Sequence, residues 1–148
     1  PTISVRPGKP NKAASSFASG IIREPLNGEA AVCPVSTDLR LWLLSPRGAI
    51  ASLIAGHELA GEAFGASRTV NLPGLSVSVG EMIAALEQVA GADVVARIRY
   101  APDPAVERIV KSWPGAWDTS RAEALGLTAD ADFAAIIRAY IDDMKAAG

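Results

Sequence analysis

Apolar residues recur at intervals of three and four along much of the chain, a spacing that places them on one face of a helix. At residues 14–22 the apolar positions follow this spacing, and Pro25 followed by Asn27-Gly28 should end that helix near Arg23. The same spacing predicts further helices at residues 46–61, 79–90, 106–110, 119–125 and 132–145. The chain therefore contains about six predicted helices.

Short apolar runs between these helices predict strands. We expect them at residues 31–35, 39–44, 68–72 and 95–100, with Pro34 marking an edge or an early end. Arg40 interrupts the run at 39–44, which otherwise has the composition of a buried strand. Val77 belongs to a short extended piece before Ser78, and Ser78 with Glu81 forms the sequence signature of a capping box. Helices and short strands in alternation indicate an α/β fold.

The first residues predict a strand that cannot stand alone. Ile3 and Val5 form a brief β-rich run that Pro7-Gly8 ends, and so short a strand needs neighbours in a sheet. We expect those neighbours to lie upstream of Pro1, so the chain is expected to be the C-terminal part of a larger protein.

Composition and charge limit the classes of protein to which this sequence can belong. Apolar residues make up 49% of the 148 residues and charged residues 20%, which is typical of one globular domain. A net charge of −2 argues against a nucleic-acid-binding surface, which normally requires a basic face. The longest apolar runs are far too short to cross a membrane. Cys33 is the single cysteine, which excludes an internal disulfide or a cysteine-cluster metal site and predicts a cytoplasmic location.

Catalytic motifs are missing from this sequence. It holds no Gly-rich phosphate loop of the G-x-G-x-x-G kind, and His57 is its single histidine, at an apolar helical spacing. Binding residues are easier to find, because Arg6 on a stiff Pro-Gly loop suits a carboxylate or phosphate. Arg40 and Arg47 are further candidates, with intramolecular ion pairs as the alternative. Trp113 and Trp117 are predicted either to wall a pocket or to seal an edge of the core.

Four segments, taken in order, resemble the C-terminal half of the extended short-chain dehydrogenase/reductases, the NAD-dependent epimerase/dehydratase group. Residues 1–8 resemble the segment that leaves the sixth Rossmann strand, and residues 39–44 resemble an Arg-containing strand that contacts substrate. Residues 70–83 resemble an "Asn, small residues, then helix" signature, and residues 118–127 resemble the closing "Asp, Ser, basic residue, Ala, Leu-Gly" stretch. Residues 5–17 and 40–47 are most similar to the sugar-acid dehydrogenases of that group.

This resemblance implies a fold, an activity and a site. Residues 1–12 would be the end of the last Rossmann strand with the substrate loop, and residues 13–148 the C-terminal substrate-binding domain, with the Rossmann core absent. The parent enzyme would use NAD, or NADP, to oxidise the 2-hydroxyl of a small, anionic, D-erythronate-like sugar acid. Its Gly-rich loop and its Tyr-x-x-x-Lys pair would lie outside this chain, so the chain alone should be inactive. The implied contacts are Pro1 for the coenzyme and, for the substrate, Thr2, Arg6, Asn11 and Arg40.

The resemblance implies partners as well as a substrate. The chain would pack on its own N-terminal Rossmann domain, and a homodimer is compatible with it. One alternative is a nucleotide-sugar epimerase or dehydratase of the same superfamily. Another is a non-catalytic, stand-alone binding module, which would fold cooperatively without any coenzyme domain.

Overall fold

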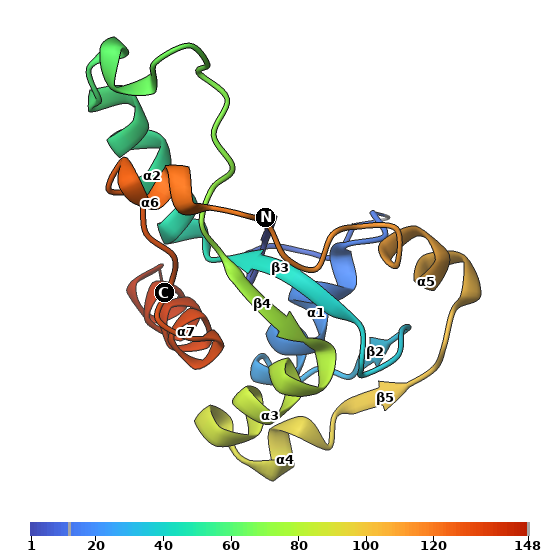
Figure 1. Ribbon diagram of the computed structural model, residues 1–148. Helices are drawn as coiled ribbons and strands as arrows, with labels where there is room; N and C mark the ends of the chain where they lie inside the picture. The colour runs from blue at the N-terminus through green and yellow to red at the C-terminus, as the bar shows by residue number, and fades with distance from the viewer. Residues whose placement is uncertain (12, 148) are drawn as a thin grey trace.

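The computed structural model describes residues 1–11 and 13–147 and confirms an α/β fold. The predicted boundary between residues 1–12 and 13–148 falls at Lys12, which lies outside the described residues. Two small sheets form the β structure. The first has the strand order β1-β3-β4 and the second pairs β2 with β5 (Figure 1). These strands are β1 (Thr2–Ile3), β2 (Ala31–Cys33), β3 (Arg40–Leu44), β4 (Leu75–Ser78) and β5 (Ile98–Tyr100).

The first strand has a partner within the chain, which corrects the expectation that its neighbours lie upstream. β1 pairs in parallel with β3, Thr2 opposite Leu43 and Ile3 opposite Leu44. The Ser4 amide extends this ladder by donating to the Leu44 carbonyl at 3.0 Å. Among the described residues, no strand pairs with the other edge of β1.

Helices pack around the sheets, with the core between α1, α3, α7 and strand β3. Residues from each of these elements are completely buried, among them Ile21, Leu43, Leu86 and Ile137. Cys33 is buried as well, as expected for a small apolar side chain. The helices are α1 (Ser16–Leu26), α2 (Pro46–Glu58), α3 (Val79–Ala90), α4 (Ala92–Val95), α5 (Pro104–Val110), α6 (Ser120–Ala124) and α7 (Phe133–Ala147), with a 3-10 turn η1 (Gly61–Phe64).

Helix α1 extends beyond its predicted end. It includes Pro25 and stops at Leu26, because a proline in the last turn forfeits only one backbone hydrogen bond. The helix closes when the Asn27 amide donates to the carbonyls of Arg23 and Glu24 at 3.1 and 3.0 Å. The sequence rule for proline therefore gave an end about one turn too early.

The predicted strand at residues 68–72 does not form. This segment is extended but irregular, and β4 begins after it at Leu75. Side chains from other elements hold its backbone: Arg121 donates to the Thr69 carbonyl at 2.8 Å, and the Trp42 indole donates to the Leu72 carbonyl at 3.3 Å. Carbonyl groups bound by side chains are not available to a strand ladder.

Helix α2 projects from the body of the molecule, with η1 beyond it and α6 alongside (Figure 1). Its apolar face forms as the periodicity predicts but lies in the open, where Ile50, Leu53 and Ile54 are 59%, 69% and 54% exposed. The face thus has no partner among the described residues. None of the described helices is long and apolar enough to cross a membrane.

Candidate functional site

Three of the predicted substrate residues line one pocket. Thr2, Arg6 and Asn11 surround a space of about 460 Å³, together with Ile3, Ala13, Ser15 and Trp113. Thr2 comes from β1, Arg6 and Asn11 come from the loop that follows it, and Trp113 reaches the pocket from the loop after α5. The pocket thus joins segments that are more than a hundred residues apart in the sequence.

The backbone of Arg6 is fixed while its side chain is exposed. The Arg6 amide donates to the Ser19 hydroxyl at 3.1 Å, and its carbonyl accepts from the Arg23 guanidinium at 2.9 Å. Two residues before Arg6, the buried Ser4 hydroxyl donates to the Ala18 carbonyl at 2.8 Å, and this bond also holds the segment against α1. Within the described part of the chain, the Arg6 guanidinium makes no hydrogen bond or ion pair. It is therefore a positioned cation with its donors available.

Asn11 shapes the far side of the pocket through a local turn. Its side-chain oxygen accepts from the Ala13 amide at 2.9 Å, and its own amide donates to the Ser16 hydroxyl at 3.2 Å. Such a turn is the usual structural use of asparagine in loops. The side-chain oxygen of Asn11 is therefore engaged by the backbone amide of Ala13.

Pro1 lies in an adjoining pocket rather than with Arg6. This second space, of about 200 Å³, is lined by Pro1, Thr2, Leu41, Trp42, Trp113, Pro114 and Trp117. Thr2 and Trp113 line both pockets, so they form the wall between them. Trp113 and Trp117 are 36% and 46% exposed, and they wall this space instead of sealing the core. The indoles of the Trp-Pro-Gly-Ala-Trp loop were the sequence signal for this wall.

Arg40 stands apart from the pocket that holds Arg6. It lies at the start of β3, and its guanidinium donates to the Ser76 hydroxyl at 3.2 Å and to the Ser76 carbonyl at 2.7 Å. The same group pairs with the Glu81 carboxylate at 3.2 Å. The Ser78 amide holds that carboxylate at 2.6 Å and, with Arg40 as a lesser cause, lowers the pKa of Glu81. The structure thus links Arg40 to β4 and α3.

Other charged candidates also have intramolecular partners. Arg47, at the start of α2, donates through Nε to the Asp143 carboxylate of α7 at 3.0 Å, so its positive charge is paired within the chain. His57 lies exposed in the last turn of α2. No cluster of three or more His, Cys, Asp or Glu side chains suited to a metal ion occurs among residues 1–11 and 13–147.

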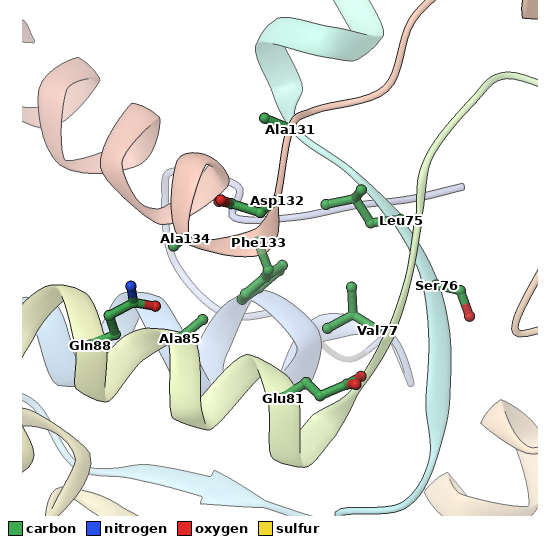
Figure 2. Close-up of a pocket in the computed structure, with 10 residues that line it drawn as sticks. All are labelled: Leu75, Ser76, Val77, Glu81, Ala85, Gln88, Ala131, Asp132, Phe133 and Ala134. Atoms are coloured by element: carbon green, nitrogen blue, oxygen red, sulfur yellow. The ribbon is translucent and has the colours of Figure 1, made fainter.

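A separate groove runs between β4, α3 and the start of α7 (Figure 2). It encloses about 420 Å³, and Leu75, Val77 and Phe133 point into it. Glu81, Gln88 and Asp132 lie at its rim. The two acids at the rim already accept hydrogen bonds, Glu81 from the Ser78 amide and Asp132 from the Ala135 amide, both at 2.6 Å. Compared with the Arg6 pocket, this groove presents fewer unengaged polar groups.

Two curated proteins are similar to almost the whole chain. D-erythronate dehydrogenase from Cupriavidus necator is 61% identical over 97% of this chain, and the enzyme of the same name from Haemophilus influenzae is 48% identical over 96%. The chain spans only 44% and 45% of the length of these two relatives. No family model matches the chain.

Solved structures reproduce the fold. A protein from Agrobacterium tumefaciens described as a nucleoside-diphosphate-sugar epimerase is 45% identical, with a TM-score of 0.95 over 100% of this chain and 43% of its own. A GalE-like L-threonine dehydrogenase from Cupriavidus necator is 24% identical, with a TM-score of 0.80 over 96% of this chain and 45% of its own. The second similarity concerns the fold alone.

Proposed function

Since this chain belongs to the extended short-chain dehydrogenase/reductases, as the counterpart of their C-terminal part, we propose that it binds the substrate of a sugar-acid dehydrogenase. The parent enzyme would oxidise the 2-hydroxyl of a small anionic acid such as D-erythronate and reduce NAD. The observation that carries this proposal is Arg6, which lines a pocket, whose backbone is held by two hydrogen bonds and whose guanidinium is unpaired among the described residues.

Arg6 supplies the recognition chemistry that an acid substrate needs. A guanidinium presents parallel donors that match the two oxygens of a carboxylate, and such charge-assisted pairs are stronger than neutral hydrogen bonds. Thr2, in the same pocket, offers a hydroxyl group, and Asn11 shapes the rim. A four-carbon acid with several hydroxyl groups suits this combination of one cation with neutral polar groups. In this proposal Arg40 contacts the substrate only if it leaves Ser76 and Glu81.

The catalytic groups would come from the rest of the protein. Oxidation of an alcohol requires a general base near the hydroxyl group and a nicotinamide ring that accepts hydride. Among the described residues, those that line the Arg6 pocket include no acid, histidine, lysine or tyrosine that could take the proton. Neither a Tyr-x-x-x-Lys pair nor a G-x-G-x-x-G loop occurs in the sequence. We therefore propose that this chain alone is inactive. From the family resemblance we also propose that Pro1 lies beside the coenzyme.

Two surfaces would receive the coenzyme-binding domain. The edge of β1 opposite β3 is available for a further parallel strand, and the apolar face of α2 is exposed. Helices that follow parallel strands normally cover a face of the sheet. An N-terminal Rossmann sheet that continued from β1 would let α2 bury Ile50, Leu53 and Ile54. A homodimer would then form through other surfaces.

The test is an assay of the natural protein that contains this chain. NAD reduction should depend on D-erythronate, and Arg6→Ala should raise the KM for the acid by roughly tenfold to a hundredfold, because a charge-assisted pair is lost. The KM of Arg6→Lys should lie between those of the unchanged protein and Arg6→Ala, because lysine keeps the positive charge but lacks the paired donors of a guanidinium. Arg99→Ala is the matched control, because Arg99 is an exposed cation on β5, away from the pocket. An unchanged KM in Arg6→Ala would contradict the assignment.

A second function is favoured by one finding, the 45% identity to a protein described as a nucleoside-diphosphate-sugar epimerase. An epimerase would bind a nucleotide-sugar rather than a free acid. UDP-sugars should then raise the melting temperature of the natural protein, whereas D-erythronate should not. The two ligands tested side by side with NAD present separate the two functions.

A further inference from the structure

A buried carboxylate lies beside Arg23, the residue that also binds the Arg6 carbonyl. Glu24, in α1, is 8% exposed, and its Oε1 accepts from the neighbouring Arg23 guanidinium at 2.7 Å. Its Oε2 is buried and has no hydrogen-bond partner among the residues that the structure describes. A buried acceptor without a donor is unfavourable, so each such atom in a native fold calls for an explanation.

Glu24 lines a pocket of about 310 Å³ between α1 and β2. Gly20 lines it as well, one helical turn before Glu24, and a Cβ atom at Gly20 would lie 3.6 Å from Oε2. A second carboxylate, that of the exposed Glu29, belongs to the same pocket, whereas Phe17 and Val32 supply apolar surface. Among the described residues, the pocket shares no lining residue with the one that holds Arg6.

From this geometry we propose that the pocket binds an organic cation, a primary ammonium or guanidinium group on a short apolar stem. The cation would donate to Oε2 of Glu24 and lie near Glu29, while its stem packs on Phe17 and Val32. Arg23 already balances the charge of Glu24 through Oε1, so among the described lining residues Glu29 leaves a net negative charge. A cationic donor satisfies both the unpaired oxygen and this excess charge.

The proposal does not depend on the dehydrogenase assignment. Arg23 joins Glu24 to the substrate loop, because it donates both to Glu24 and to the Arg6 carbonyl. Pro10 of that loop also lines the Glu24 pocket, whereas Arg6 does not. Loss of D-erythronate oxidation would therefore leave the cation site untouched. Equally, the absence of cation binding would leave the Arg6 assignment intact.

The experiment is a calorimetric titration of the natural protein with propylammonium chloride at constant ionic strength. The uncharged isostere 1-propanol is the ligand control. A lysine-containing tripeptide, Gly-Lys-Gly with blocked ends, is the second probe. Binding of propylammonium but not of 1-propanol is expected. Tighter binding of the peptide would identify a basic side chain of a partner as the source of the cation, and weaker binding would identify a free amine.

Two variants and a control make the test specific. Glu24→Gln should weaken propylammonium binding at least tenfold, because the amide keeps the shape but loses the charge. Gly20→Ala places a methyl group in the pocket at ordinary contact distance from Glu24 and favours the helix, so binding should fall while the melting temperature rises. Glu62→Gln, an exposed acid on η1, should change neither. Equal affinity for propylammonium and 1-propanol, or unchanged binding in Gly20→Ala, would overturn the proposal in favour of a water molecule at Oε2.

Discussion

Arg6 and Arg40 are both exposed arginines, yet the contacts of their guanidinium groups differ. Arg40 contacts Ser76 twice and Glu81 once, so its guanidinium joins three elements of the fold. The guanidinium of Arg6 has no such contact among the described residues, although its backbone is held at both ends. A cation that is already paired must lose those bonds before it can bind a substrate, whereas a positioned and unpaired one need not.

Acid should weaken the link between β3 and α3. The Ser78 amide, and to a lesser degree Arg40, lower the pKa of Glu81 in the folded protein. A carboxyl group whose pKa is depressed by folding stabilises the folded state at pH values above its unfolded-state pKa, which is about 4.3 for Glu. This stabilisation is lost as the pH falls through the folded-state pKa. Melting temperatures measured from neutral pH downward should show a smaller acid-induced fall in Glu81→Gln than in the unchanged protein. The same fall in both would contradict this linkage.

At the scale of elements, α3 is the helix whose start the sequence specifies most fully. The Ser78 hydroxyl accepts from the Glu81 amide at 3.1 Å, and the Glu81 carboxylate accepts from the Ser78 amide at 2.6 Å. This reciprocal pair satisfies two amides that the helix itself leaves free. Residues about one and two turns along, such as Met82 and Leu86, are then directed into the core.

Removal of this cap should have a measurable cost. Ser78→Ala is expected to lower the free energy of unfolding by about 1 kcal/mol, because one amide at the start of α3 loses its acceptor. Ser78→Asp keeps an acceptor at the same position and should retain most of the stability. Urea denaturation monitored by circular dichroism provides the comparison. A loss in Ser78→Asp as large as that in Ser78→Ala would show that the cap is not the cause.

Helix α2 illustrates the limit of periodicity at this scale. The spacing of Ile50, Leu53 and Ile54 correctly predicts a helix, and Pro46 correctly marks its first turn. Periodicity reports that one face is apolar but does not state what covers that face. In this chain none of the described residues covers the apolar face of α2.

At the scale of the whole molecule, the exposed face of α2 should govern association. The 148-residue chain prepared by itself is expected to self-associate as its concentration rises, because Ile50, Leu53 and Ile54 form a contiguous apolar surface. Leu53→Lys should shift the sedimentation profile toward the monomer. Glu87→Lys, at an exposed position on α3, is the matched control and should not. A monomer at all concentrations in the unchanged chain would contradict this expectation.

The errors of sequence interpretation have two physical causes. Residues 68–72 have a β-rich composition, yet Arg121 and Trp42 bind their carbonyls and no strand forms. Pro25 should end a helix by local rules, yet α1 continues for one more residue because the Asn27 amide closes the last turn. At residues 68–72 contacts from distant residues override a local preference, whereas at Pro25 the backbone bonds of the last helical turn do so. The family resemblance predicted Thr2, Arg6 and Asn11 as substrate-side residues, and their shared pocket and the separation of Arg40 from it required the fold.

The sequence by itself determined the elements with strong local signals: the helical periodicities, the capping box at Ser78, the short strand before Pro34 and the α/β class. These depend on interactions between residues a few positions apart, which the order of amino acids states directly. Only the tertiary structure decided that β1 pairs with β3, that Trp113 meets Arg6 across one pocket, and that Glu24 is buried with an unpaired oxygen. Each of these joins distant segments or depends on burial, and burial is a property of the packed molecule rather than of any local stretch of sequence.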